Sequence, residues 1–88
     1  MSKEVLIYSS SLCPYCYRAK ALLNAKNVKF REINVDMNPA ARQKMRNKAG
    51  GRNTVPQIFI DGDHVGGCDD LYDLERAGHL NAMLSIAS

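Results

Sequence analysis

Two cysteines separated by two residues are the part of this sequence whose types and spacing suggest chemistry. They are Cys13 and Cys16, with Pro14 and Tyr15 between them. A thiolate attacks disulfides, and a helix N-terminus stabilises that anion through its free backbone N–H groups and the positive end of the helix dipole. The pair therefore predicts thiol–disulfide exchange: Cys13 attacks to form a mixed disulfide, and Cys16 or an external thiol resolves it.

A zinc site is the alternative interpretation of the same pair. Cys68, together with His64 or His79, would bring the number of candidate ligands to four. Structural zinc sites usually place two ligand pairs on loops, whereas Cys13 and Cys16 stand between an apolar run and a helical pattern, with a proline inside the pair. Redox chemistry fits this spacing better, and no metal site is predicted.

Two further segments predict a binding site around the cysteines. Thr54 and Val55 precede Pro56, and a cis proline there would turn the Val55 backbone outward for pairing with an extended substrate. A proline at the start of an edge strand is the alternative. In residues 66–70, Gly-Gly-Cys-Asp-Asp, glycines permit close approach, helix N-terminal amides can hold a carboxylate, and an acidic side chain can hold an ammonium. The amino-acid-like end of a ligand matches this combination.

Hydrophobic periodicity indicates which elements position these residues. Residues 5–8 form a continuous apolar run, which is typical of a strand covered on both faces. A helix is expected to begin at Pro14 and to stop at Asn27, and a second strand is expected over residues 31–35. The first part of the chain therefore predicts one β-α-β unit with parallel strands.

The rest of the chain predicts a second helix, a hairpin and two C-terminal helices. The second helix is expected over residues 38–49, with the asparagine at its first position as N-cap. Residues 57–65 hold two short apolar runs around an Asp-Gly turn signal, which indicates a hairpin. Asp69 or Asp70 is expected to cap a third helix, and a final short helix follows over residues 80–84.

Length, charge and cysteine count limit the classes of protein to consider. The 88 residues leave room for a single domain, 1–88. The net charge of +3 is spread along the chain, which gives little support to nucleic-acid binding. The densest basic stretch, residues 42–52, is interpreted as a solvated helix face or, alternatively, as a field that attracts a small anionic thiol.

Cellular location is also constrained by the sequence. No apolar run approaches the roughly 18 residues that span a bilayer, and the N-terminal stretch lacks the apolar region and cleavage site of a signal peptide. Three cysteines, an odd count, argue against the disulfide framework of a secreted protein. We therefore expect a cytoplasmic protein without membrane partners, and the spread charge predicts no nucleic-acid partner. A monomer is expected because the face that carries the reactive cysteines must stay open.

With the three motifs in this order, the sequence resembles the dithiol glutaredoxins over essentially its whole length. The resemblance implies an α/β, thioredoxin-like fold: a four-stranded mixed sheet flanked by helices, in the order β-α-β-α-β-β-α. It also implies a glutathione-dependent enzyme that reduces protein disulfides and glutathione mixed disulfides, with glutathione as co-substrate and no permanently bound cofactor. Alternatives are a thioredoxin-like donor recycled by a flavoprotein reductase, or a module that binds an iron–sulfur cluster or zinc.

Carried over by position, the resemblance also implies contacts with glutathione. The Val55 backbone would pair with the cysteine portion of glutathione, and the Cys68 and Asp69 N–H groups would meet the γ-glutamyl carboxylate. The Asp70 side chain would meet the ammonium, and Arg52 the glycine carboxylate. The full implied set is Tyr15, Arg52, Thr54, Val55, Pro56, Cys68, Asp69 and Asp70. Many family members carry a lysine three residues before the first cysteine; here that residue is Ser10.

Overall fold

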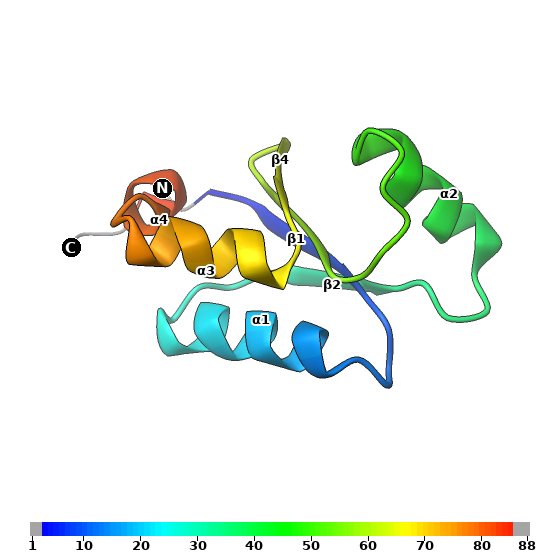
Figure 1. Cartoon of the computed structure of the whole chain (residues 1–88), viewed down its shortest axis with the longest axis horizontal. Helices are drawn as coiled ribbons and strands as arrows, with labels where there is room; N and C mark the ends of the chain where they lie inside the picture. The colour runs from blue at the N-terminus through cyan, green and yellow to red at the C-terminus, as the bar shows by residue number, and fades with distance from the viewer. Residues whose placement is uncertain (1–2, 86–88) are drawn as a thin grey trace.

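The computed structural model describes residues 3–85, which form one four-stranded sheet flanked by helices (Figure 1). The elements in chain order are β1 (Val5–Ser9), α1 (Pro14–Ala25), β2 (Arg31–Asn34), α2 (Pro39–Lys48), β3 (Gln57–Ile60), β4 (Asp63–Gly66), α3 (Cys68–Arg76) and α4 (Leu80–Leu84). The strand order is β2-β1-β3-β4, in which β1 pairs parallel with β2 and the other two pairs are antiparallel. The predicted mixed sheet is confirmed, and α4 is the expected final short helix.

The two faces of the sheet are covered by different helices. In Figure 1, α1 lies along the lower side of the sheet and α2 at the upper right. The larger core cluster joins alternate residues of β1 and β3 to α1, α3 and α4, and the smaller cluster joins the intervening residues, Tyr8 and Phe59, to Met45 of α2. Because strand side chains alternate between faces, a sheet covered on both faces needs continuous apolar strands. This explains the apolar runs in β1 and β3.

The helix starts follow from the capping residues, with one difference from the prediction. Asn38 caps α2, and its side chain accepts a hydrogen bond from the Ala41 N–H at 3.1 Å. For α3 the N-cap is Gly67, so the prediction of Asp69 or Asp70 was wrong. Asp70 is the third residue of the helix, and its carboxylate reaches back to accept the Gly67 N–H at 2.9 Å. A carboxylate at this position accepts from the backbone N–H of the N-cap residue, whereas an N-cap side chain would accept from an N–H in the first turn.

Replacing Leu23 with alanine is expected to destabilise the protein by about 2–5 kcal/mol. Leu23 lies on α1 and is fully buried in the larger core cluster, so truncation leaves a cavity between the helix and the sheet. Chemical denaturation measures the free energy of unfolding. Leu12→Ala is the matched control, because Leu12 is 94% exposed and its truncation is expected to change stability by less than about 0.5 kcal/mol. Equal losses in the two variants would contradict this description of the core.

Candidate functional site

Cys13 lies where the sequence predicts, as the N-cap residue of α1. Its Sγ accepts a hydrogen bond from the Cys16 backbone N–H, with 3.2 Å between N and S. The same sulfur lies 3.8 Å from the carbonyl oxygen of Val55. Cys13 is 8% exposed, so a small part of the residue is accessible from the surface. This placement provides the free backbone donors that stabilise a thiolate.

Cys16 lies one turn into α1 and is fully buried. Burial raises the pKa of the Cys16 thiol to about 12, and the hydrogen bond and charge of Cys13 act in the same direction. The Ser10 backbone N–H and the Lys20 ammonium act in the opposite direction. Cys16 is therefore a protonated thiol at neutral pH in the reduced protein, as its predicted buried position implies.

A groove of about 150 Å³ brings together residues that lie far apart in the sequence. It is lined by Tyr15, Arg52, Thr54, Val55, Pro56, Gly67, Cys68 and Asp69. Seven of the eight residues implied as glutathione contacts are among them, and the eighth, Asp70, is bonded to Arg52. The structure therefore assembles the predicted set in one place, while the contacts of each residue with glutathione stay predictions.

The Val55–Pro56 peptide bond is cis, in agreement with the proposal made from the sequence. The alternative, in which Pro56 begins an edge strand, was wrong because β3 pairs with β1 on one side and β4 on the other. Cys68 is 3% exposed and belongs to the larger core cluster, so only its backbone is available to a ligand.

Asp70 is held at the edge of the groove by two donors. Its Oδ2 accepts the Gly67 N–H at 2.9 Å and an N–H of the Arg52 guanidinium at 3.3 Å. These contacts, the Gly67 bond first, lower the pKa of the Asp70 carboxyl from its ordinary value. Gly66 permits this arrangement, since its φ is +117° and a Cβ there would lie 2.3 Å from Asp70 Oδ2. Arg52, which lines the groove, therefore has an anionic partner beside it in Asp70.

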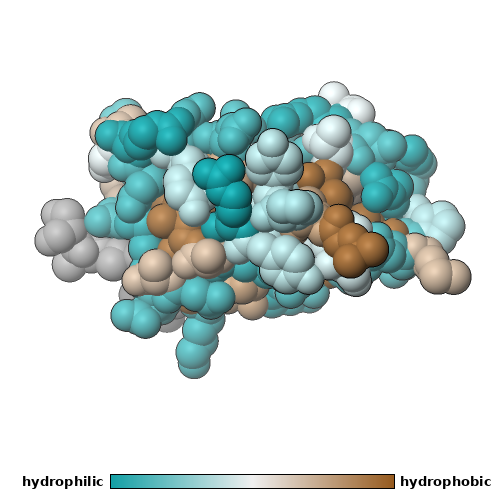
Figure 2. Space-filling model, turned by 60° about the horizontal axis from the view of Figure 1, so that its bottom comes forward, coloured by the Kyte–Doolittle hydropathy of each residue, from teal (hydrophilic) through white to brown (hydrophobic). Residues whose placement is uncertain are grey.

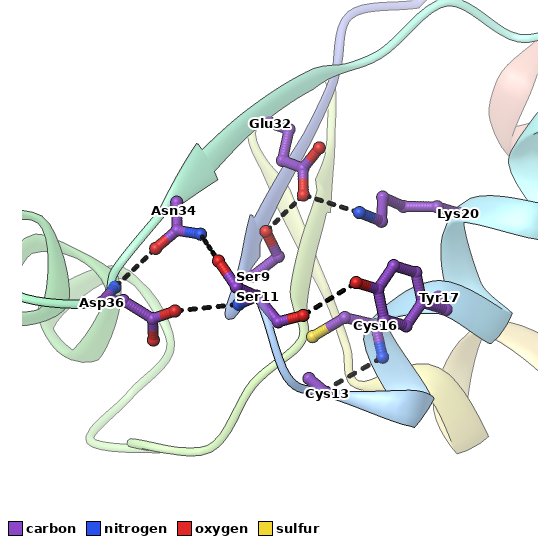
Figure 3. Close-up of polar contacts among 9 residues, drawn as sticks. All are labelled: Ser9, Ser11, Cys13, Cys16, Tyr17, Lys20, Glu32, Asn34 and Asp36. Carbon is purple, nitrogen blue, oxygen red and sulfur yellow. Dashed lines mark hydrogen bonds and ion pairs between the residues drawn. The ribbon is translucent and has the colours of Figure 1, made fainter.

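A polar network before Cys13 was missed by sequence reasoning (Figure 3). Ser9 Oγ donates to Glu32 Oε2 at 2.5 Å, and Lys20 Nζ donates to the same oxygen at 2.8 Å. In the adjoining loop, the Ser11 N–H donates to Asp36 at 2.8 Å. The one available signal was Lys20, which follows Cys16 by four residues and so shares its helix face.

The tyrosines differ from one another in their surroundings. Tyr8 is buried in the smaller core cluster. Tyr72 is half-buried, and its hydroxyl donates to the Arg18 carbonyl oxygen at 3.1 Å. Tyr17, in contrast, is 57% exposed and does not pack in the core. Its hydroxyl instead donates to the Ser11 carbonyl oxygen at 2.8 Å and ties α1 to the loop before Cys13.

The histidines and free thiols were the candidate ligands for a metal. His64 lies on β4, 2.7 Å from Gln57 Oε1, and its ring packs on Phe59 with 5.0 Å between centroids. His79 is exposed and precedes α4. Among residues 3–85, no group of three or more His, Cys, Asp or Glu side chains is arranged to hold a metal ion. Over the same residues, no helix combines the length and hydrophobicity required to cross a bilayer.

Comparison with known proteins relates this chain to one family. The family model described as Glutaredoxin matches residues 5–65. Glutaredoxin 3 of Escherichia coli strain K12 is 56% identical over 81 residues, which cover 92% of this chain and 96% of that protein. A glutaredoxin of Pseudomonas aeruginosa is 57% identical over 81 residues, which cover 92% of this chain and 95% of that protein.

Solved structures agree with these relationships. A crystal structure of a buckwheat glutaredoxin–glutathione complex has a TM-score of 0.86 at 32% identity, over 97% of this chain and 83% of that chain. The solution structure of a Brucella melitensis glutaredoxin has a TM-score of 0.82 at 52% identity, over 94% of this chain and 89% of that chain. The chain therefore has the thioredoxin-like fold, belongs to the glutaredoxin family and is a glutathione-dependent thiol–disulfide oxidoreductase.

Proposed function

We propose that Cys13 is the nucleophile and Cys16 the resolving thiol in the reduction of protein disulfides and glutathione mixed disulfides. The position of Cys13 Sγ carries this proposal: it accepts the Cys16 N–H at the start of α1 and lies 3.8 Å from the carbonyl oxygen of Val55, a residue of the groove. A sulfur in that position has donors for its anionic form and a binding groove beside it.

The sequence of steps balances in sulfur, electrons and protons. The Cys13 thiolate attacks the substrate disulfide, one substrate thiolate leaves and takes up a proton, and a mixed disulfide forms on Cys13. Cys16 then attacks Cys13 Sγ and releases the second substrate thiol, which leaves a Cys13–Cys16 disulfide. Two glutathione molecules reduce this disulfide and become glutathione disulfide. When the substrate is a glutathione mixed disulfide, one external glutathione can replace Cys16.

The groove is proposed as the glutathione site, with the contacts implied by the family. Buckwheat glutaredoxin was solved as a complex with glutathione, and this relative supports glutathione as the co-substrate here. Arg52 lines the groove and forms an ion pair with Asp70, so a cation and an anion are both available there for the charged groups of a γ-glutamyl peptide. No permanently bound cofactor is proposed.

Protein disulfides are proposed as substrates because exposed apolar side chains adjoin the two cysteines in the sequence. Figure 2 shows a face that is mostly hydrophilic, with small hydrophobic areas. Leu12, Tyr15 and Tyr17, which are neighbours of Cys13 and Cys16 in the sequence, are 94%, 55% and 57% exposed. Exposed aromatic and aliphatic side chains beside a reactive group offer contact area to a polypeptide.

We also propose that residues 1–88 act as a single glutaredoxin domain, as a monomer in the cytoplasm, without nucleic-acid or membrane partners. The two core clusters on one sheet support a single domain; residues 1–2 and 86–88 lie outside the described part. The relatives compared above are glutaredoxins, so a thioredoxin-like donor or a zinc or cluster-binding module is not favoured.

Trapping the mixed disulfide tests the assignment of roles. The Cys16→Ser protein, incubated with glutathione disulfide, is expected to gain one glutathione on Cys13, because the thiol that would displace it is absent. Mass spectrometry of the intact protein and of its peptides identifies the modified residue. The matched Cys13→Ser protein is expected to gain none under the same conditions. A glutathione adduct on Cys68 of the Cys16→Ser protein, or on Cys16 of the Cys13→Ser protein, would overturn the proposed roles.

A further inference from the structure

Lys20 and Cys16 lie on the same face of α1. Lys20 follows Cys16 by four positions, so their side chains leave the helix one turn apart. Cys16 is fully buried, and only 20% of the Lys20 side chain is exposed. A lysine covered to this extent lacks much of the hydration of its ammonium, so the ammonium requires a partner within the protein.

Glu32 on β2 is that partner. Its Oε2 accepts from Lys20 Nζ at 2.8 Å and from Ser9 Oγ at 2.5 Å, and Ser9 is fully buried at the end of β1 (Figure 3). The hydrogen bond to Glu32 raises the pKa of Lys20, and the hydrogen bonds from Lys20 and Ser9 lower the pKa of Glu32. Both groups therefore stay charged across the neutral range, and the ammonium is fixed on the Cys16 side of the helix.

The groups that face Cys16 act on its ionisation in opposite directions. Besides burial, the hydrogen bond and the charge of Cys13 raise the pKa of Cys16, whereas the Ser10 N–H and the Lys20 ammonium lower it. Around Lys20 itself the charged or titratable groups are Glu32, Cys16 and Tyr17, whose ring centroid lies 4.9 Å from Nζ. Once Cys13 is in a mixed disulfide, its hydrogen bond and charge no longer oppose ionisation of Cys16, but Ser10 and Lys20 still favour it.

We propose that Lys20 is a positioning residue for the resolving step, in which its ammonium, fixed by Glu32 and Ser9, stabilises the Cys16 thiolate as Cys16 attacks the Cys13 mixed disulfide. This role depends on the function proposed above, in which Cys16 is the resolving thiol. In the step, Cys16 releases its proton to solvent and bonds to Cys13 Sγ. The bond from Cys13 to the substrate sulfur breaks, and the substrate leaves as a thiolate that takes up a proton.

The test measures the resolving step alone, across a neutral to alkaline pH series. Dithiobis(nitrobenzoate) reacts with Cys13 and releases one coloured thiolate, and attack by Cys16 on the resulting mixed disulfide releases the second. In the Lys20→Met protein the second release is expected to be about three- to tenfold slower at neutral pH. Its pH profile is expected to move to higher pH, because a thiolate without its cation forms only at lower proton concentration.

Two matched variants distinguish an effect of the Lys20 charge from an effect of the substitution on the structure. Lys20→Arg keeps the cation and is expected to restore the rate to within about twofold of the wild type. Lys44→Met makes the same change of net charge at an exposed position on α2 and is expected to leave the pH profile in place. A Lys20→Met profile that coincides with the wild type, or a Lys20→Arg protein as slow as Lys20→Met, would overturn the proposed role of Lys20.

Cys16→Ser distinguishes this inference from the function on which it depends. If the second coloured thiolate appears at the wild-type rate without Cys16, the proposed resolving role itself is wrong. If Cys16→Ser blocks the second release and Lys20→Met does not slow it, the resolving role stands and the role of Lys20 is wrong. A slower first release in Lys20→Met would place its effect on Cys13 and would also overturn the inference.

Discussion

Replacing Cys13 with serine is expected to lower glutathione-dependent turnover of a small mixed disulfide by about a thousandfold or more. The serine hydroxyl has nearly the same size as the thiol and accepts the same Cys16 N–H, so the start of α1 is expected to keep its geometry. An un-ionised hydroxyl is a poor nucleophile toward sulfur unless a general base activates it. Within residues 3–85, the hydrogen-bond partners of the Cys13 sulfur are the Cys16 N–H and the Val55 carbonyl oxygen, and neither is a general base. The assay follows oxidation of glutathione with a coupled reductase.

Cys16→Ser is the matched comparison for that experiment. It removes one thiol from the same helical turn, yet glutathione can resolve the mixed disulfide on Cys13 from outside. We expect this variant to keep turnover of the small mixed disulfide within about tenfold of the wild type and to lose most reduction of protein disulfides. Full activity in Cys13→Ser, or equal loss in both variants with the small substrate, would contradict the assigned roles.

Gly66→Ala is expected to raise the KM for glutathione about tenfold and to destabilise the protein by about 1–3 kcal/mol. Gly66 has a φ of +117°, which L side chains rarely adopt, and the added Cβ would lie 2.3 Å from Asp70 Oδ2 and 3.0 Å from an Arg52 nitrogen. The Asp70 carboxylate must then leave its bond with the Gly67 N–H. One methyl group is therefore expected to displace Asp70 and its ion-pair partner Arg52, which lines the groove.

Steady-state kinetics with varied glutathione, together with chemical denaturation, measure the two effects. Gly62→Ala is the control, because Gly62 has a φ of +88° in the turn between β3 and β4, and a Cβ there meets nothing within 4 Å. It is expected to cost stability through backbone strain while the KM for glutathione stays within about twofold of the wild type. A KM that is raised equally in both variants would show that the crowding at Asp70 has no role in binding.

Several parts of the site could be predicted because the physics that determines them is local. The spacing of Cys13 and Cys16 places both thiols on one helical turn whatever surrounds them, and Pro14 suits the first position of that helix. The apolar runs of β1 and β3 required cover on both faces, and the two core clusters provide it. Asn38 was recognised as a cap because capping involves only the next few residues.

Other parts depended on which segments become neighbours. Glu32 reaches Ser9 and Lys20 because β1 and β2 pair in parallel with Ile7 opposite Glu32, which places the carboxylate on the side covered by α1. Spacing along the chain does not determine that register. The predicted start of α3 was too late for a related reason. An acidic residue can cap a helix from the N-cap position or from the third helical position, and the path of the chain after β4 decides between the two.

The amino-acid sequence by itself therefore determined the reactive pair, the order of helices and strands, and the three motifs, since each depends on residues within a turn or a strand of one another. Tertiary structure decided the rest: the groove that joins Tyr15 to Arg52 and to residues 54–56 and 67–69, the burial that raises the pKa of Cys16, and the ion pair that fixes Lys20 beside it. These features depend on strand register and on which helix covers each face of the sheet. Electrostatic and packing energies act through space, between segments that lie far apart along the chain.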